Sequence, residues 1–212
     1  MAKSEYVLQL DGVQAAVHAK FRTLGFRKSG RSHNRNTAQG LLHVVTFQMG
    51  SFPIGYVIPG FRDKLYGQFA VNLGVLLPCV QKRLNEFPIP QSVADSHCSI
   101  RDRLREPIDG RQWFRLGEDS PAAVVDLLEL HGLPFLEQFE SYQDVLSYFE
   151  GHGDLPFLNH GRACLEMAVV AREIGNIDMS NRLFDQAYDC ANKPSSRAYI
   201  ARVAERLGHA VT

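Results

Sequence analysis

The chain has 212 residues, of which 45% are hydrophobic and 22% are charged, and its formal net charge is zero. These values are ordinary for a globular protein with a sizeable core, arranged as one large domain or as a domain with an appendage. No run approaches the roughly eighteen apolar residues of a membrane-spanning helix, and the first ten residues, MAKSEYVLQL, lack the pattern of a signal peptide. We therefore expect a cytoplasmic protein without membrane contact.

The charge is unevenly distributed along the chain. From Gly12 to Leu116 there are 15 Lys and Arg against 6 Asp and Glu, whereas from Gly117 to Thr212 there are 7 against 15. Such asymmetry is typical of a surface for nucleic acid or for an acidic partner. It fits equally well with two halves of the chain that dock on each other.

The first predicted element is an amphipathic helix that ends at Gly25. Apolar residues recur at steps of three and four, which places one stripe on the helix, formed by Leu10, Val13, Val17, Phe21 and Leu24. Gly25 fits the left-handed position that closes such a helix, and Phe26 follows as the hydrophobic contact.

A basic strand is predicted directly after this helix. If Phe26 faces the core, strict alternation sends the polar side chains to the other side of the sheet. These side chains are Arg27, Ser29, Arg31, His33 and Arg35. Residues 34–40 then predict a polar turn, and Leu41 to Gln48 the returning strand.

The next predicted strands set the facing of the sheet. From Gln68 to Leu77, every second residue is a large apolar one, and this set is predicted to face the core. Its members are Phe69, Val71, Leu73, Val75 and Leu77. Pairing Val45 and Phe47 with that face leaves Gln48 on the same side as Asn72. Residues 50–67, rich in Gly, Pro and aromatics, are expected to fold over the sheet as a lid or rim.

A further strand is predicted from Cys98 to Arg105, with Arg101 and Arg103 on the polar side and Asp102 interrupting the apolar side. The four strands thus share an apolar face for the first helix and an opposite polar face, which is the best candidate for a binding surface. The predicted members of that polar face are Arg27, Arg31, His33, Arg35, Gln48, Asn72, Arg101 and Arg103.

Trp113, the only tryptophan, follows this strand. Beside Phe114 it is expected to anchor the core, and the alternative is that it stacks against a ligand.

Helices are predicted from Ser120 onward. The first runs from Ala122 to Leu130 and is predicted to break at Gly132-Leu133-Pro134; shorter helices follow over Phe135–Phe139 and Tyr142–Glu150. The last fifty residues resemble a tetratricopeptide hairpin, with helices from Ala163 to Ile174 and from Met179 to Ala191, and a final helix from Ser195 to Leu207. Because one such unit cannot bury its own face, we expect it to pack on the sheet domain or on another copy.

Catalytic and metal-binding motifs are missing from the sequence. It has no GxSxG elbow, no Walker loop, no GxGxxG opening a helix and no HExxH, which lowers the odds of an enzyme without excluding one. Cys79, Cys98, Cys164 and Cys190 are scattered without a CxxC pair, which predicts buried, reduced thiols. Residues 151–161 hold His152, Asp154 and His160, but their spacing matches no metal site, so capping and turn roles are expected. No cofactor is expected.

Arginine outnumbers lysine by 17 to 6, which suits bidentate recognition of phosphate or carboxylate. A biased genome composition is the simpler explanation.

Several segments carry a resemblance to a known family. LGFRKSGRSHNR, VVTFQMGS, FAVNLGV, HCSIRDRL and the Trp113-Phe114 pair, in this order, are similar to a bacterial family catalogued as domain of unknown function 4304. The resemblance covers roughly residues 10–116. His33 stands where many members have an aromatic residue, and Gln48-Met49-Gly50-Ser51 departs from the usual strand end. The family implies no established activity; members near bacterial toxin and defence genes imply an immunity or interaction role by association.

We therefore predict an α+β fold with a mostly antiparallel sheet packed by an N-terminal helix, followed by a helical half. The predicted domains are a sheet domain over 1–117 and a helical region over 118–212 packed on it. The leading hypothesis is a non-enzymatic interaction protein that receives an acidic protein partner. Its binding residues would be Arg27, Arg31, Arg35, Gln48, Asn72, Arg101, Arg103 and, in the stacking alternative, Trp113.

Two other hypotheses remain. One is a small-molecule or nucleotide-binding domain, with or without hydrolysis, that uses the same face beneath residues 51–67. The other is RNA or DNA binding, which would gain from aromatic residues between the arginines, and the basic strand lacks them. The sequence leaves the oligomeric state open.

Overall fold

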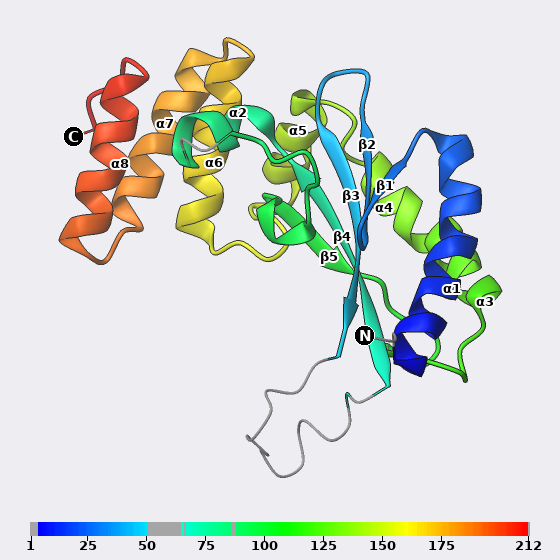
Figure 1. Ribbon diagram of the computed structural model, residues 1–212. Coiled ribbons are helices and arrows are strands. Elements are labelled where there is room, and N and C mark those ends of the chain that lie inside the picture. Colours follow the sequence, from blue (N-terminus) through cyan, green and yellow to red (C-terminus); the bar gives the residue numbers. More distant parts are fainter. Residues whose placement is uncertain (1–3, 51–64, 66, 86–87, 212) are drawn as a thin grey trace.

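A six-stranded antiparallel sheet lies at the centre of the molecule (Figure 1). The structure is a computed structural model that describes residues 4–50, 65, 67–85 and 88–211, so most of the predicted lid lies outside the described residues. The strands run in the order β1-β2-β3-β4-β5, and β6 pairs with the start of β4. They are β1 (Arg27–Ser29), β2 (Ser32–Asn36), β3 (Leu42–Met49), β4 (Gln68–Leu76), β5 (Ile100–Arg103) and β6 (Phe114–Arg115). The predicted fold class is confirmed.

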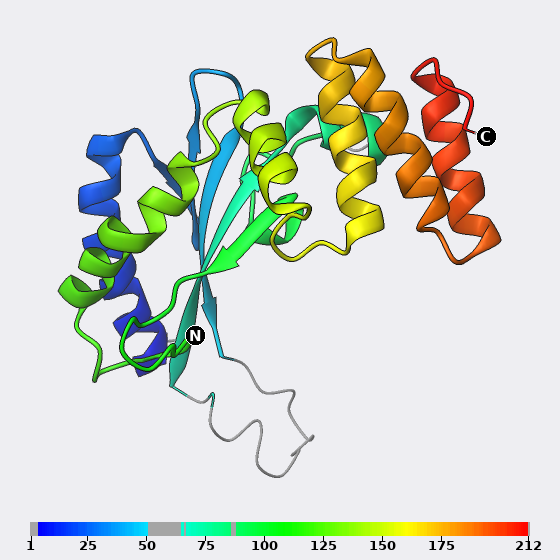
Figure 2. The ribbon, with the colours of Figure 1, turned by 180° about the vertical axis from the view of Figure 1, so that it is seen from behind.

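Helices lie on one side of the sheet and beyond its end. α1 (Glu5–Phe21) and α3 lie side by side on one side, while α6, α7 and α8 form a row beyond the end of β4 (Figures 1 and 2). α2 (Pro78–Val80) directly follows β4. The helices after β6 are α3 (Pro121–Leu127), α4 (Leu133–Glu137), α5 (Tyr142–His152), α6 (His160–Glu173), α7 (Ile177–Asp189) and α8 (Pro194–Arg206).

The end of the first helix agrees with the prediction. A 3₁₀ turn over Arg22–Leu24 follows α1, and Gly25 takes the left-handed conformation at φ 85°. The Phe26 backbone N–H donates to the Phe21 carbonyl oxygen at 3.0 Å, and the two rings lie 4.7 Å apart. This hydrogen bond from beyond a glycine, with its apolar contact, closes the helix and turns the chain into β1.

The face of the sheet beneath α1 is mostly apolar and forms part of the main core. Val45 lies opposite Leu73 and Phe47 opposite Val71, as predicted, and these side chains are buried in the main core. The same core continues into the C-terminal helices, for example to Val145. We call this face the helix-covered face and the opposite one the second face.

The predicted single basic strand is wrong, because it is a hairpin. Gly30 has φ 58°, and the two-residue turn that it begins pairs β1 with β2, with Ser29 opposite Ser32 and Lys28 opposite His33. Residues opposite each other in a hairpin face the same side of the sheet. Here each pair joins an odd-numbered to an even-numbered residue, so the odd-numbered residues of β2 share a side with the even-numbered residues of β1. His33 and Arg35 therefore face α1 instead of the polar side.

Half of the second face is covered by the segment that joins β4 to β5. The Asn34 side chain donates to the Val93 carbonyl oxygen at 2.8 Å and accepts from the Val93 N–H at 3.1 Å. Val93 and Cys98 pack on Val44, and a Cβ added at Gly74 would lie 2.7 Å from the Cys98 sulfur. Glycine at position 74 thus permits this close approach, which splits the predicted polar face.

The predicted helix break at Gly132-Leu133-Pro134 is also wrong. Helical turns continue from α3 through a π-helical segment, Leu128–Gly132, into α4. Pro134 lies in the first turn of α4, a position at which a missing N–H is best tolerated. A Cβ at Gly132 would lie 2.9 Å from the Leu128 side chain and 3.5 Å from that of Leu73, so glycine lets the helix approach β4.

The helical end of the molecule is built around α6. Every residue from Ala163 to Ala171 is buried, because α6 is packed by α2, α5 and α7. The Ser180 hydroxyl of α7 donates to the Ala168 carbonyl oxygen at 2.8 Å, and Gly175, at φ 81°, turns the chain between α6 and α7. These are the two helices that the sequence predicts as a hairpin.

Three of the cysteines, Cys79, Cys98 and Cys164, are free and buried, as predicted. Cys190 is free but exposed, because it lies at the C-terminal end of α7. Within the described residues, no helix combines the length and the apolar character that crossing a membrane requires.

Candidate functional site

Arg103 lies at the centre of a polar cluster on the second face, beside the segment that carries Val93 and Cys98. Its Nε donates to the Asn72 side-chain oxygen at 2.8 Å, and its Nη2 donates to the Gln48 side-chain oxygen at 3.1 Å. The Asn72 side-chain nitrogen donates to that same Gln48 oxygen at 3.0 Å. The register places these residues on β5, β4 and β3, so three neighbouring strands hold one guanidinium.

The hydrogen bonds within this cluster leave only donors facing outward. Arg103 has no acceptor, so both amides must turn their oxygens toward it. Gln48 is exposed, and in this orientation its NH₂ group points away from the arginine. The terminal edge of the guanidinium, formed by Nη1 and one Nη2 hydrogen, keeps its donors as well. A group that offers only acceptors, such as a carboxylate or a phosphate, complements this array.

Trp113 completes the cluster from the strand end beside β6. The Arg103 guanidinium carbon lies 5.2 Å from the centre of the Trp113 ring, within the range of a cation–π contact. Trp113 is partly exposed, whereas the adjacent Phe114 is buried in the core and paired with Phe69. Trp113 therefore does not anchor the core as expected, and instead supports Arg103.

The charge of Arg103 is not neutralised by an ion pair within the described part of the chain. Burial lowers the pKa of its guanidinium from the ordinary value, while the nearby Asp95 carboxylate acts in the opposite direction. An arginine remains protonated at physiological pH after such a shift, because the guanidinium group is a very strong base. Arg103 is thus a partly desolvated cation held by neutral groups.

Arg101 projects from the same side of β5, two residues before Arg103. Its guanidinium carbon lies 5.7 Å from the centre of the Phe157 ring, and its Nε is buried without a hydrogen-bond partner. Phe157 has φ 68°, the only non-glycine residue with positive φ in the described ranges, and its side chain is 63% exposed. The loop between α5 and α6 thus holds a strained backbone that presents an aromatic ring to Arg101.

Asp102, which interrupts the apolar pattern of its strand, has a local role. Its carboxylate accepts the Arg103 backbone N–H at 2.8 Å and lies 3.4 Å from Nη2 of Arg105. The following Leu104 N–H donates inward to Val71 at 2.9 Å, so the Arg103 N–H points to the outer edge of β5. Asp102 therefore closes a backbone donor at the edge of the sheet.

Arg35 lies away from this cluster, on the helix-covered face. Its Nη2 donates to the Glu140 carboxylate at 3.0 Å and to His43 Nδ1 at 2.9 Å, and its guanidinium lies 5.1 Å from the centre of the Phe26 ring. The other ring nitrogen of His43 donates to the Phe139 carbonyl oxygen at 2.8 Å. Burial lowers the pKa of His43, consistent with a neutral ring that accepts from Arg35. These contacts join β2 and β3 to the junction of α4 and α5.

The remaining predicted binding residues are also separate from the cluster. Arg27 is exposed on β1, with second-face parity, but the segment at Val93 and Cys98 lies between it and Arg103. Arg31 is exposed in the turn between β1 and β2. The structure therefore brings together Gln48, Asn72, Arg101, Arg103 and Trp113, and it separates Arg27, Arg31 and Arg35 from them.

Part of the charge asymmetry is balanced by ion pairs within the molecule. Carboxylates of the acidic half pair with cations of the basic half, and these contacts connect the helices to the sheet region. The pairs are Lys20 with Glu129, Arg35 with Glu140 at 3.0 Å, and Arg83 with Glu173 at 2.6 Å.

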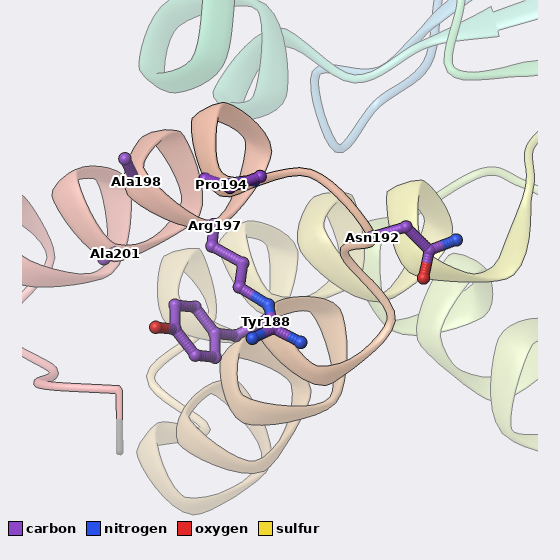
Figure 3. Close-up of a pocket in the computed structure, with 6 residues that line it drawn as sticks. All are labelled: Tyr188, Asn192, Pro194, Arg197, Ala198 and Ala201. Atoms are coloured by element: carbon purple, nitrogen blue, oxygen red, sulfur yellow. The ribbon is translucent and has the colours of Figure 1, made fainter.

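Cavities lie away from the Arg103 cluster or at its rear. A shallow cavity of about 420 Å³ lies between α7 and α8, where Arg197 extends over Tyr188 (Figure 3). A groove of about 510 Å³ lies among the start of α6, the end of α7 and the start of α8, with Arg162 and Lys193 in its lining. A smaller cavity of about 240 Å³ lies at the edge of β5, between Leu104 and Phe135.

The histidines of the loop after α5 make local backbone contacts. Nδ1–H of His152 donates to the Tyr148 carbonyl oxygen at 2.8 Å, and Nδ1–H of His160 donates to that of Gly153 at 3.0 Å. The Asp154 carboxylate accepts the Leu155 N–H at 3.0 Å. Among the described residues, no group of three or more His, Cys, Asp or Glu side chains is arranged to hold a metal ion.

Sequence reasoning missed Phe157. The residue lies about fifty positions after Arg101 in a loop that attracted attention only for its histidines, and nothing in its local pattern indicates positive φ. A flanking proline marks the loop but not the direction of the ring.

Comparison with curated proteins and with solved structures gives no match. The model of one protein family, described as a domain of unknown function, matches residues 17–138, which is more than half of the chain. This range includes the whole Arg103 cluster and continues through α3 and α4, whereas Phe157 and α5 to α8 lie after it. The chain thus belongs to the family described as Domain of unknown function (DUF4304).

Proposed function

We propose that this chain is a non-enzymatic interaction protein that binds an acidic segment of a protein partner at Arg101 and Arg103 on the second face of its sheet. The observation that carries the proposal is the Arg103 guanidinium, which two amide oxygens hold in place at 2.8 and 3.1 Å. Within the described residues, no carboxylate pairs with it. A preorganised, partly desolvated cation of this kind favours a charge-assisted, bidentate hydrogen bond to an incoming anion.

A protein carboxylate fits this surface better than a nucleic-acid backbone does. Asp95 lies close enough to influence Arg103. This negative charge would repel a continuous row of phosphates. Two exposed arginines of the sheet region, Arg27 and Arg31, do not extend the surface, because the segment at Val93 lies between them and Arg103.

A small molecule is a weaker fit to the same site. Among the cavities lined by described residues, the one that includes Arg103 lies behind it at the edge of β5 and has a volume of about 240 Å³, which is below the roughly 300–1,000 Å³ of ordinary ligand pockets. The cluster side chains Gln48, Asn72, Arg103 and Trp113 also provide no group that exchanges a proton near neutral pH, as a general acid or base must. A toxin-neutralising role would be one instance of partner binding, and its only support is the family resemblance.

The proposal is tested by capture from host lysate with matched variants. Tagged wild-type protein, Arg103→Met and Arg27→Met are compared at low and moderate salt, with and without nuclease. Arg27 is the control because it is an exposed sheet arginine outside the cluster. We expect one stoichiometric protein that survives nuclease and moderate salt, is retained by Arg27→Met and is lost with Arg103→Met.

Three outcomes would contradict the proposal. Capture that is equal for both variants would remove Arg103 from the interface. Recovery of nucleic acid alone, with a steep loss at higher salt, would favour the nucleic-acid hypothesis. If neither protein nor nucleic acid is recovered at either salt concentration, the partner-binding proposal is contradicted. A thermal-shift screen of nucleotides and metabolites is then the next experiment.

A further inference from the structure

Arg101 and Arg103 form a pair of cations at a fixed spacing. They lie opposite Gly74 and Asn72 of β4, and therefore project from the same side of β5. Two residues along a strand advance the chain by roughly 7 Å. An extended peptide repeats its own side chains on one side at that same interval, so two of its acidic residues, separated by one residue, match the two arginines.

Each arginine is positioned by a different part of the protein. The side chains of β3 and β4 hold Arg103 through hydrogen bonds, whereas the Phe157 ring from the loop after α5 packs against Arg101 at 5.7 Å. Both contacts leave the terminal guanidinium nitrogens without an ion pair inside the described part of the chain. These contacts already restrict the two arginine side chains. Binding of two anions therefore costs less side-chain conformational entropy than it would with mobile arginines.

The edge of β5 disfavours simple strand addition. Strand addition requires free backbone groups on the outer edge, and the Asp102 carboxylate already accepts the Arg103 backbone N–H at 2.8 Å. Recognition must then come through side chains on the second face. Both guanidinium groups are partly buried, so a thin, extended chain reaches them more readily than a helix with a diameter of about 10–12 Å.

We infer that the site binds an extended acidic segment of a partner protein in which two carboxylates are separated by one residue, one bound by Arg101 and the other by Arg103. This inference rests on the proposed function, because it specifies the ligand of the same surface. Trp113 packs against Arg103 and Phe157 against Arg101, whereas Asp102 projects from the other side of β5 and does not face the bound peptide.

The test uses synthetic peptides of about ten residues with a Gly/Ser/Thr background and no aromatic residue. One peptide carries Glu at positions i and i+2, a second at i and i+1, and a third carries a single Glu; a helical peptide with Glu at i and i+4 is the fourth ligand. Trp113, the only tryptophan, lies against Arg103 and serves as the fluorescence reporter. Calorimetry on the full chain provides an independent affinity.

We expect the i, i+2 peptide to bind about tenfold more tightly than the i, i+1 peptide, the gain of one further charge-assisted contact. Arg101→Gln should remove this preference and weaken the i, i+2 peptide more than the single-Glu peptide. Arg103→Gln should weaken all of the peptides. Thermal unfolding of both variants checks that they remain folded.

Equal affinity for the i, i+2 and i, i+1 peptides, or tighter binding of the helical peptide, would overturn the inference. Tighter binding of a single-stranded oligonucleotide with steep salt dependence would also overturn it, and would move the site to phosphate recognition. These failures are distinct from failure of the proposed function. If lysate capture depends on Arg103 but the peptides show no spacing preference, only the ligand geometry is wrong.

Discussion

The two faces of the sheet use arginine in opposite ways. On the helix-covered face, Arg35 is 18% exposed and donates to Glu140, so its charge is neutralised within the protein. On the second face, Arg103 is held by the neutral amides of Asn72 and Gln48. Arg35 joins the sheet to the C-terminal helices, whereas the charge of Arg103 is not neutralised by an ion pair within the described residues.

The excess of cations in the basic half of the sequence therefore includes two groups of side chains, those paired within the protein and those without an ion pair among the described residues. Some carboxylates of the acidic half pair with Lys20, Arg35 and Arg83, which accords with docking of the two halves. Arg101 and Arg103 have no such partner within the described residues, so they are the candidates for an external acidic ligand. Counting charges along the chain does not separate these two uses.

The largest expected effect tests burial on the helix-covered face through His33. Its side chain is fully buried, and burial, with help from His18 and Lys28, lowers its pKa from 6.5 to about 4. The unfolded chain binds a proton between these pH values and the folded chain does not, so stability is complete above pH 6.5 and falls as the pH drops toward 4. A shift of that size corresponds to about 3 kcal/mol.

Denaturant unfolding at pH 7 and pH 4 measures this effect in the wild type and in His33→Phe, whose ring fits beside Phe21 and Phe47. The variant should lose about 3 kcal/mol less than the wild type on acidification. All other titratable residues are the same in both proteins, so the difference isolates His33. An equal loss in both proteins would contradict the prediction.

The second prediction compares the two arginines directly. Arg35→Met should lower the free energy of unfolding by about 1–3 kcal/mol, because the largely buried hydrogen bonds to Glu140 and His43 are lost together. Arg103→Met should cost about 1 kcal/mol, because water can replace the contact to the exposed Gln48 and only the hydrogen bond to the buried Asn72 oxygen is lost. Denaturant unfolding measures the stability of both variants, and the lysate capture assay measures their partner binding. A larger stability loss for Arg103→Met would make that arginine structural.

The third prediction concerns the segment that covers half of the second face. A Cβ at Gly74 would lie 2.7 and 2.9 Å from the Cys98 sulfur and Cβ, so Gly74→Ala should destabilise the protein by about 1–3 kcal/mol. The control is the same change at Gly12, an exposed position of α1 where a Cβ meets nothing within 4 Å. Gly12→Ala should stabilise by about 0.5–1 kcal/mol. Thermal unfolding that shows the same sign for both would refute the close approach at Gly74.

The smallest expected effect concerns Phe157. Glycine accepts φ 68° without strain, and the ring is 63% exposed, so Phe157→Gly should change stability by less than about 1 kcal/mol. It should nevertheless reduce the preference for the i, i+2 peptide, because Arg101 loses the ring that packs against it. The Tm and the peptide titration measure the two effects separately. A large drop in Tm with an unchanged peptide preference would assign Phe157 to folding instead of binding.

Much of the fold follows from local patterns. The stripe from Leu10 to Phe21 and the glycine at position 25 predict α1 and its end, and the alternation in β4 predicts its core face. The same alternation places Gln48 beside Asn72, and the side chains are hydrogen-bonded at 3.0 Å. The hairpin at Gly30 and the continuous helix through Pro134 were missed, because a two-residue turn and a π-helical segment produce no distinct periodicity.

The sequence by itself determined the apolar stripe of α1, the core face of β4 and the presence of arginines on β5, because these depend on patterns among near neighbours in the chain. Only the tertiary structure decided which arginines are neutralised. Arg35 meets Glu140 about a hundred residues away, Asn72 and Gln48 meet Arg103 from other strands, and Phe157 meets Arg101 from a distant loop. The electrostatic free energy of a charge depends on burial and on nearby charges in space, which spacing along the chain does not encode.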